Sequence, residues 1–413
     1  MISGSDRRIL RDLARRLAEI ADLPIQAERR ELWKSFNSLR PVRPMMLIFP
    51  EGSLWGGELV PYAAMQCEGE NAPSIERELR FRIYAFEHFQ DDAVVEKEWV
   101  VNKAISHSGW GLTARHVPTT EARGSWKFDP VIKEPADLKK LKIPEIFYDE
   151  KATQQRLDEA QDLFGDILDV KLKGVAHISF HLMNQYTELR GLAEVMMDMY
   201  ENPQMLHDAM ALLEEGHSHI LKQYVDMNLL SLNNDNTYHS SGGNGYTDEL
   251  PKEGFDPGRV RPCDMWSSAE AQEMAQVSPE MHAEFVLAYE KRLLEPFALN
   301  GYGCCEDLTR KLDHVFTIPN IRRISISPWA DVDACAEKLQ DKYIFSWKPK
   351  PQHLVGDFDP EMIRSYIAHT VDAARGCVLE MILKDTHTCE NHPERFDEWT
   401  RVAREVIEEK AGG

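Results

Sequence analysis

The chain has 413 residues, of which 43% are hydrophobic and 28% are charged, a composition typical of a folded globular protein. Its 69 acidic residues against 48 basic ones give a formal charge of -21, which argues against binding to phosphate backbones or anionic lipid. No apolar run of about 20 residues could cross a bilayer, and the N-terminal segment has an early acid and no apolar signal core. We therefore expect a cytoplasmic protein with no nucleic-acid or membrane partner.

The first 40 residues predict two helices. Apolar residues recur at helical spacing between Ile9 and Ala21, and a second short helix is expected over residues 28–39. The run MMLIF at 45–49 is too short for a helix and is preceded and followed by prolines, so it predicts a strand.

Seven further apolar runs follow, and segments with helical periodicity lie between the later ones. The longest of these segments, Pro203–Met227, carries a clear buried stripe. Strands alternating with helices imply a parallel sheet, and eight strands predict an α/β protein with a (β/α)8 TIM barrel. We assign residues 1–40 to an N-terminal helical extension, 41–413 to the barrel, and the irregular stretch 106–145 to an insertion. The seven runs are residues 98–101, 167–180 in part, 229–233, 297–304, 323–326, 343–347 and 378–383.

Three side chains that can bind metal come from separate loops or strand ends, namely Asp235, Cys263 and Cys304. In a barrel, the carboxyl ends of the strands converge on one face, so distant residues can share one site. A carboxylate with two thiolates suits Zn²⁺, and three protein ligands with an open fourth position are typical of a catalytic zinc. We predict such a zinc site, with packing of dispersed cysteines as the alternative.

Several details of this site stay open at the level of sequence. Adjacent strand residues face opposite sides, so Cys305 competes with Cys304 as the ligand. His387, Cys389 and Glu380 are further contributors that the sequence leaves undecided. An odd number of cysteines with no export signal makes a disulfide framework improbable, and three are assigned to packing: Cys67, Cys335 and Cys377.

Aromatic and titratable residues surround these positions along the chain. An aromatic-lined cleft with a few polar groups suits a planar small molecule. His239 and Glu51 are our candidates for proton transfer, and the glycine-rich stretch 240–246 is interpreted as a flexible cover, since it lacks phosphate-loop spacing. Each of these residues has a purely structural role as its alternative. The residues predicted to bind substrate are Tyr238, Trp266, Tyr302, Trp347 and His387.

Four segments of the chain carry a family resemblance, namely ILRDLARRLAEIADLP, ERRELWKSFNSLRPVRPMMLIFPE, ELRGLAEVMMDMYENPQMLHDAMALLEE and ENHPERFDEW. They resemble the uroporphyrinogen decarboxylase-like superfamily, whose members fold as (β/α)8 barrels. The Arg-rich N-terminal signature of the porphyrinogen decarboxylases is absent from this chain. The resemblance therefore implies the branch of zinc-dependent, corrinoid-linked methyltransferases, although Tyr302-Gly303-Cys304 stands where that branch often has His-x-Cys.

The missing histidine makes members that demethylate methoxylated aromatics the better match. The resemblance then implies methyl transfer from an aryl methyl ether to the cob(I)alamin of a separate corrinoid protein, with zinc polarising the ether oxygen. The chain has no corrinoid motif of its own, so a partner must supply the cobalt.

Three alternatives remain open on the sequence alone. The first is a lyase or decarboxylase of a small acid, with Lys348 and Arg323 as carboxylate clamps. The second is a methylcorrinoid:thiol methyltransferase, and the third is a binding protein that keeps the barrel as a scaffold. Neither the methyl donor, the corrinoid partner nor assembly into a homodimer is fixed by the sequence.

Overall fold

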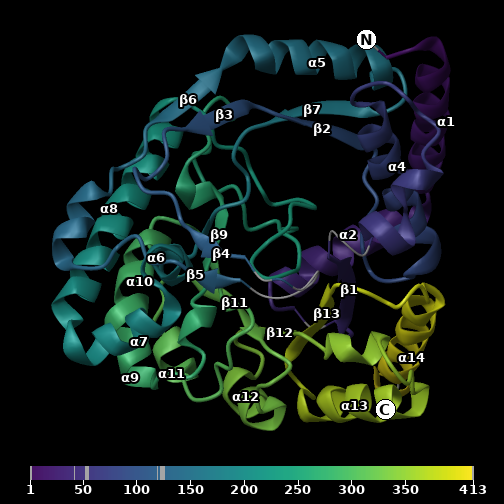
Figure 1. Ribbon diagram of the computed structural model, residues 1–413. Coiled ribbons are helices and arrows are strands. Elements are labelled where there is room, and N and C mark those ends of the chain that lie inside the picture. The colour runs from purple at the N-terminus through teal and green to yellow at the C-terminus, as the bar shows by residue number, and fades with distance from the viewer. Residues whose placement is uncertain (1, 41, 52–54, 119, 121–125, 412–413) are drawn as a thin grey trace.

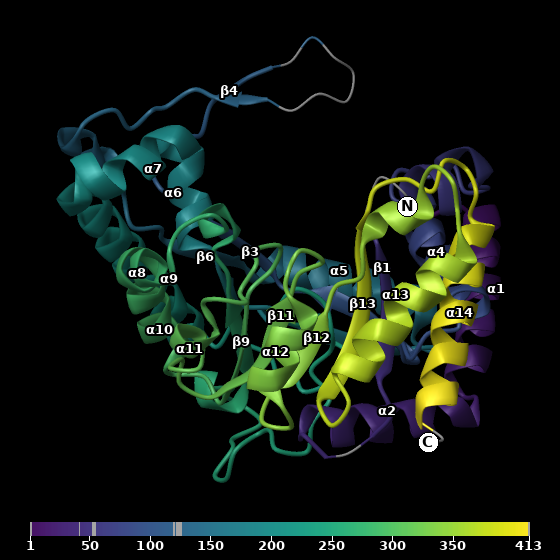
Figure 2. The same cartoon turned by 90° about the horizontal axis from the view of Figure 1, so that it is seen from below.

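A curled sheet of seven parallel strands forms the centre of the molecule (Figures 1 and 2), in the order β1-β13-β12-β11-β10-β9-β8. The computed structural model describes residues 2–40, 42–51, 55–118, 120 and 126–411. All neighbouring strands in this sheet pair in parallel, so their carboxyl ends lie on one side. The strands are β1 (Met45–Pro50), β8 (Ser179–Phe180), β9 (Trp266–Ala269), β10 (Leu299–Tyr302), β11 (Ile321–Ile326), β12 (Ile344–Trp347) and β13 (Val378–Thr386).

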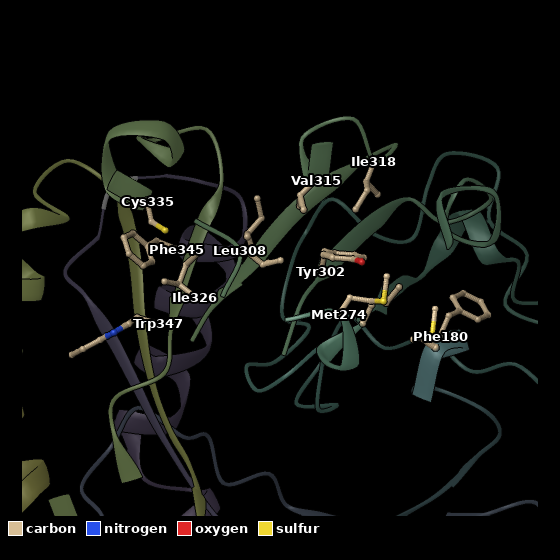
Figure 3. Close-up of a cluster of buried hydrophobic side chains, with 14 of the residues drawn as sticks. Phe180, Met274, Tyr302, Leu308, Val315, Ile318, Ile326, Cys335, Phe345 and Trp347 are labelled. Carbon is tan, nitrogen blue, oxygen red and sulfur yellow. The ribbon is translucent and has the colours of Figure 1, made fainter. Parts of the chain in front are cut away.

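Alternate strand residues enter two different apolar cores, as the period of two of a strand requires. Phe345 and Trp347 of β12 belong to the large core between the sheet and its helices, whereas Ile344 belongs to a smaller core on the inner face. Figure 3 shows part of the large core, with Tyr302 of β10 among its buried side chains. Both faces of the central strands are thus buried, which explains why their sequences read as continuous apolar runs.

Helices cover the outer face of the sheet (Figure 2). The longest of them, α8, begins at Pro203, where the missing N–H of proline costs no helical hydrogen bond. These helices are α6 (Leu182–Arg190), α7 (Leu192–Glu201), α8 (Pro203–Asp226), α9 (Pro279–His282), α10 (Ala288–Leu294), α11 (Leu312–Val315), α12 (Val332–Leu339), α13 (Pro360–Ala373) and α14 (Glu394–Ala411). Within the described ranges, no helix combines the length and the apolar character needed to span a bilayer.

A third core lies in the N-terminal half of the chain and gathers apolar side chains of α1, α4 and α5. Two strands at its side, β2 and β7, pair with each other in parallel but form a separate two-stranded sheet. Among the described strands, the pairing therefore gives a half-barrel, and the closed eight-stranded ring that the sequence predicted is not confirmed. The elements of this part are α1 (Gly4–Ala21), α2 (Pro24–Asn37), α4 (Ala72–His88), α5 (Glu150–Phe164), β2 (Glu98–Asn102) and β7 (Asp169–Lys173).

Two short antiparallel pairs occur within and beside the stretch expected to be an insertion. The pair β3 and β6 packs near α5, and β4 with β5 forms an arm that projects beyond α6 and α7 in Figure 2. His116 Nε2 at the base of the arm lies 2.6 Å from Glu188 of α6. The strands are β3 (Ala104–His107), β4 (His116–Val117), β5 (Lys127–Phe128) and β6 (Ile146–Asp149).

The segment 238–246, which we call the plug, lies against the inner face of the sheet. Apart from Tyr238 and Ser240, its residues are buried, so the expected flexible cover is in fact an internal packing element. A Cβ on Gly242 would lie 2.4 Å from Ile382 Cγ2, and one on Gly301 of β10 would lie 2.8 Å from Ser240. These glycines permit the close approach of the plug to the strands.

Beneath the plug, a buried ion pair crosses the inner face of the sheet. Arg323 of β11 donates from Nε to Glu380 of β13 over 2.9 Å, and both side chains are fully buried. Arg323 Nη1 also lies 2.6 Å from His239 Nδ1, and Nη2 donates to Asn37 Oδ1 over 2.6 Å. The guanidinium is thereby surrounded by acceptors, as a buried charge requires.

Candidate active site

The carboxyl ends of β10 and β13 bring two thiols, an ammonium and a carboxylate together. Cys304 Sγ lies 3.5 Å from Cys305 Sγ and 3.9 Å from Lys384 Nζ. Ser241 of the plug donates to Cys304 Sγ over 3.3 Å. Asp385 completes the group, with Oδ1 lying 3.1 Å from Lys384 Nζ and Oδ2 lying 3.8 Å from Cys305 Sγ. We call these five residues the Cys304 cluster.

This environment stabilises the thiolate form of Cys304. The hydrogen bond from Cys305 lowers the pKa of Cys304 to about 6, and it acts against burial, which would raise it. The ammonium of Lys384 and the hydroxyl of Ser241 act in the same direction as Cys305. The pKa of Cys305 moves the opposite way, because its proton is held by the neighbouring sulfur. At neutral pH, the pair therefore carries its negative charge on Cys304.

A histidine and a carboxylate follow the next two strands of the sheet. His181 comes directly after β8, and its Nδ1 lies 2.5 Å from Oε1 of Glu270, which comes directly after β9. Burial would lower the pKa of His181, but the hydrogen bond and the charge of Glu270 outweigh it and raise the pKa above its ordinary value of 6.5. The His181 side chain is 45% exposed, so this imidazole is accessible at the carboxyl end of β8.

Glu306 connects these two groups through the backbone. Its carboxylate accepts from the amide of Cys304 over 2.8 Å and from the amide of Ala271 over 3.2 Å. Burial and the negative charge of Glu270 raise the pKa of Glu306 to about 7. The loops that follow β9 and β10 are thus held at a fixed distance by one buried side chain.

Two predicted residues, Tyr238 and Glu51, lie beside the Cys304 cluster. Glu51 directly follows β1 and accepts from the backbone amide of Asp385 over 3.3 Å. The ring of Tyr238 packs edge-on against Phe49 at 5.3 Å, and burial together with nearby charges raises its pKa to about 12. The negative charge of Cys304 is among those that raise this pKa, whereas the ammonium of Lys384 lowers it.

A cavity of about 600 Å³ begins on the other side of Tyr238. Its wall is formed by β2, by residues 173–177 and by residues 235–237. His177 belongs to this wall, and its ring centroid lies 5.7 Å from that of Tyr238. Charged side chains also line the cavity, among them Arg82, Glu96 and Lys173.

Three aromatic residues predicted to bind substrate are core residues instead. Trp266, Tyr302 and Trp347 are fully buried. The indole of Trp266 donates to the carbonyl of Gly245 over 3.0 Å, and the hydroxyl of Tyr302 donates to Glu290 over 3.0 Å. Strand alternation explains the outcome for Tyr302 and Trp347, because both side chains belong to the large core, part of which Figure 3 shows.

His239 was predicted to move a proton, but it lies in the buried ion-pair network under the plug. Burial and the positive charge of Arg323 lower its pKa well below 6.5. It is neutral and packed against the ring of Trp266 at 4.5 Å, so it has no access to substrate. His387 is exposed beyond the end of β13, where the structure leaves its predicted role untested.

The predicted zinc trio does not come together. Cys263 lies three residues before β9 begins, whereas Cys304 follows the end of β10, and these two strands pair in parallel register. The two thiols therefore lie at opposite ends of the strands, too far apart to bind the same metal ion. Asp235 forms an ion pair with Lys173 and accepts from Thr237, away from both thiols.

The other possible metal donors among the described residues do not form a site either. Within the described ranges, no group of three or more His, Cys, Asp or Glu side chains is arranged to hold one. A metal ion beside Cys304 and Asp385 would have to share its place with a positive charge already there, the ammonium of Lys384. Cys389 donates to Glu58 over 3.0 Å, and Glu380 is bound to Arg323, so neither is available as a ligand. The described side chains thus do not fit a zinc ion.

Sequence reasoning missed His181, Glu270, Lys384 and Ser241. Lys384 directly follows the apolar run 378–383, so its place at a strand end could have been predicted. Glu270 was missed with its strand, because β9 has four residues and two of them are serines. Ser241 was hidden by the interpretation of the plug as a cover.

Neither a family model nor a curated protein matches this sequence. Solved structures do match, among them a methyltransferase from Methanosarcina mazei with a TM-score of 0.51. The match covers 91% of this chain and 97% of that chain at 10% sequence identity. At this identity the similarity establishes a shared fold, and the chain is an α/β protein of that architecture.

Proposed function

We propose that this chain is an enzyme that transfers a methyl group from a methoxylated aromatic molecule to the corrinoid of a separate protein. One observation carries the proposal. His181, bound to Glu270, and the Cys304 cluster, with its ammonium and its thiolate, both lie at the carboxyl ends of the strands of one sheet. The shared fold of a methyltransferase supports the same class of reaction. In proteins built on parallel strands, chemistry is placed at this end of the sheet.

The reaction breaks the bond between the ether oxygen and the methyl carbon, and the oxygen must then receive a proton. His181 supplies it from Nε2, because Nδ1 is occupied by Glu270. The raised pKa favours the protonated imidazole, and the hydrogen bond to Glu270 holds the ring in a fixed orientation. A phenol leaves instead of a phenolate, which lowers the cost of its departure.

Lys384 provides the second source of positive charge at the site. Burial would lower its pKa, but Cys304 and Asp385 outweigh this and raise it, so its ammonium persists. Fixed beside Tyr238, this ammonium can attract the electron-rich ring or a phenolic oxygen of the substrate. Cys304 and Asp385 hold the ammonium in place.

The corrinoid, when bound, supplies the nucleophilic cobalt(I) that accepts the methyl group. The ends of β8, β10 and β13 allow access for it, since His181 is 45% exposed and Asp385 is 35% exposed. Cys305 is exposed as well. The partner therefore has a route to the reacting carbon at this end of the sheet.

Zinc remains a prediction of the sequence, and no step here passes through it. The rival lyase needs free carboxylate clamps, but Arg323 is bound to Glu380. Lys348 is buried and donates to Ser346 over 2.7 Å, and burial lowers its pKa to about 7. A decarboxylase is therefore less well supported than methyl transfer.

The direct test mixes the purified chain with methoxylated aromatics and measures the released phenol, with and without added cob(I)alamin. Release that requires the corrinoid supports the proposal. Decarboxylation of an aromatic acid, or no release with any methoxylated compound, would refute it. Metal analysis of the same sample decides the zinc prediction, because a bound catalytic zinc gives about one ion per chain.

His181→Ala tests the proton donor within that assay. Loss of the general acid should lower the turnover rate by about 10²–10⁴-fold. His369→Ala is the matched control, since His369 on α13 also contacts a carboxylate, that of Asp333 at 2.9 Å, but lies outside the site. Equal rates for the two variants would remove His181 from the mechanism.

A further inference from the structure

Cys304 and Cys305 are neighbours in sequence whose sulfur atoms also face each other. Adjacent residues of an extended strand point to opposite sides, yet here the two Sγ atoms lie 3.5 Å apart. The chain bends after β10, where Gly303 has φ of 95° and Glu306 accepts from the amide of Cys304. Only glycine adopts this φ without strain, so the bend that turns both thiols to one side is encoded locally.

The surroundings of the two sulfurs differ in a way that assigns each a role. Cys304 faces a hydroxyl and an ammonium, Ser241 at 3.3 Å and Lys384 at 3.9 Å, which favour its thiolate. Cys305 is exposed and donates toward the carboxylate of Asp385 at 3.8 Å. One sulfur is thus prepared as a nucleophile, and the other keeps a proton beside an acceptor.

We propose that Cys304 and Cys305 form a redox modification site, at which low-molecular-weight disulfides oxidise the pair to a disulfide between neighbours. The Cys304 thiolate attacks one sulfur of the reagent, forming a mixed disulfide and releasing one thiolate. Cys305 then gives its proton to Asp385 or water and attacks the Cys304 sulfur. The reagent's second half leaves as a thiolate, so the two cysteines lose two electrons and the reagent gains them.

Oxidation of the pair also alters the Cys304 cluster. Lys384 loses the thiolate that faces it and keeps only Asp385 as a charged partner. A disulfide between adjacent residues joins Cα atoms that lie closer together than those of ordinary disulfides. Such a bond is strained, so reducing thiols should open it again readily. The modification is therefore reversible and acts directly at the strand ends, whatever reaction occurs there.

The test treats the native chain with oxidised glutathione and maps the cysteine peptides by mass spectrometry. We expect the peptide with residues 304 and 305 to lose two hydrogen atoms without retaining glutathione, and dithiothreitol to restore it. Cys305→Ser should retain one glutathione on Cys304, since the second step is blocked. Lys384→Met should slow the first step at least about tenfold at pH 7, because the thiolate fraction falls as the pKa rises.

Cys263 provides the internal control, being a partly exposed thiol at the opposite end of the sheet. It should react more slowly than Cys304 under the same conditions. Stable glutathione on the wild-type pair, or preferential reaction at Cys263, would overturn the proposal. A failure of the methyl-transfer assay leaves it intact, because thiol mapping requires no turnover.

Discussion

Cys304 shows how three neighbours can decide the charge of one side chain. Its sulfur is mostly enclosed, and burial alone would favour the neutral thiol. Cys305, Ser241 and Lys384 reverse that preference and lower the pKa to about 6. Two opposite charges, the thiolate and the ammonium, therefore lie side by side at neutral pH.

Lys384→Met tests this balance at the scale of one residue. The rate at which wild-type Cys304 reacts with iodoacetamide should be half of its maximum near pH 6, rising above that pH and falling below it as the thiol is protonated. Removal of the ammonium should move that midpoint to higher pH, because the thiolate loses its positive neighbour. An unchanged midpoint in the pH dependence of alkylation would show that Lys384 does not act on Cys304.

The sequence could identify only part of this site. Cys304, Tyr238 and Glu51 were predictable because each stands at a strand end or in the loop beside one. Cys263 was wrong as their partner, since its loop was assumed to follow a strand when it precedes β9. His181 follows a strand of two residues, which is too short to be recognised by periodicity.

The plug packs closely against the inner face of the sheet and holds side chains in place there. Gly242 has φ of 109° and lies against Ile382, and Gly243 has φ of 103° and lies against Arg323. The same segment positions Ser241 at Cys304 and His239 at Arg323. Packing of the plug and organisation of the site are therefore coupled.

Gly242→Ala should destabilise the chain through a clash with β13. The new Cβ would lie 2.4 Å from Ile382 Cγ2, and overpacking of this kind costs about 1–3 kcal/mol. Gly254→Ala is the matched control, because Gly254 also has a positive φ, of 74°, but nothing lies within 4 Å. Urea unfolding of the two variants isolates the clash, and equal midpoints would mean that the plug does not pack as described.

Most strands of the sheet could be predicted from their apolar runs. The run 45–49 is β1, and the runs around 297–304, 323–326, 343–347 and 378–383 contain β10 to β13. The run 229–233 failed as a strand, and its residue Leu230 makes only an isolated bridge with Val175. Its apolar character serves the core, where Leu230 is buried. A run of apolar residues indicates that a segment is buried, but a buried segment need not pair with a neighbouring strand.

The whole molecule combines a half-barrel with a separate N-terminal core. Closure of the ring would require pairing partners on the free edges of the two edge strands, β1 and β8, which apolar runs alone do not specify. The cavity of about 600 Å³ lies where β2 and residues 173–177 face the loop at 235–237. The cavity therefore lies on the N-terminal side of the molecule, beside β2 and β7.

The most direct test of this account is the pH dependence of phenol release by the wild type and by Glu270→Gln. His181 must be protonated to act, and its pKa is raised, so the rate should hold past pH 6.5 and then fall as pH rises. Glutamine keeps a hydrogen-bond acceptor but removes the negative charge that raises the pKa of His181, so the fall should move to lower pH. A falling limb that stays in place in Glu270→Gln would contradict the assignment of His181 as the proton donor.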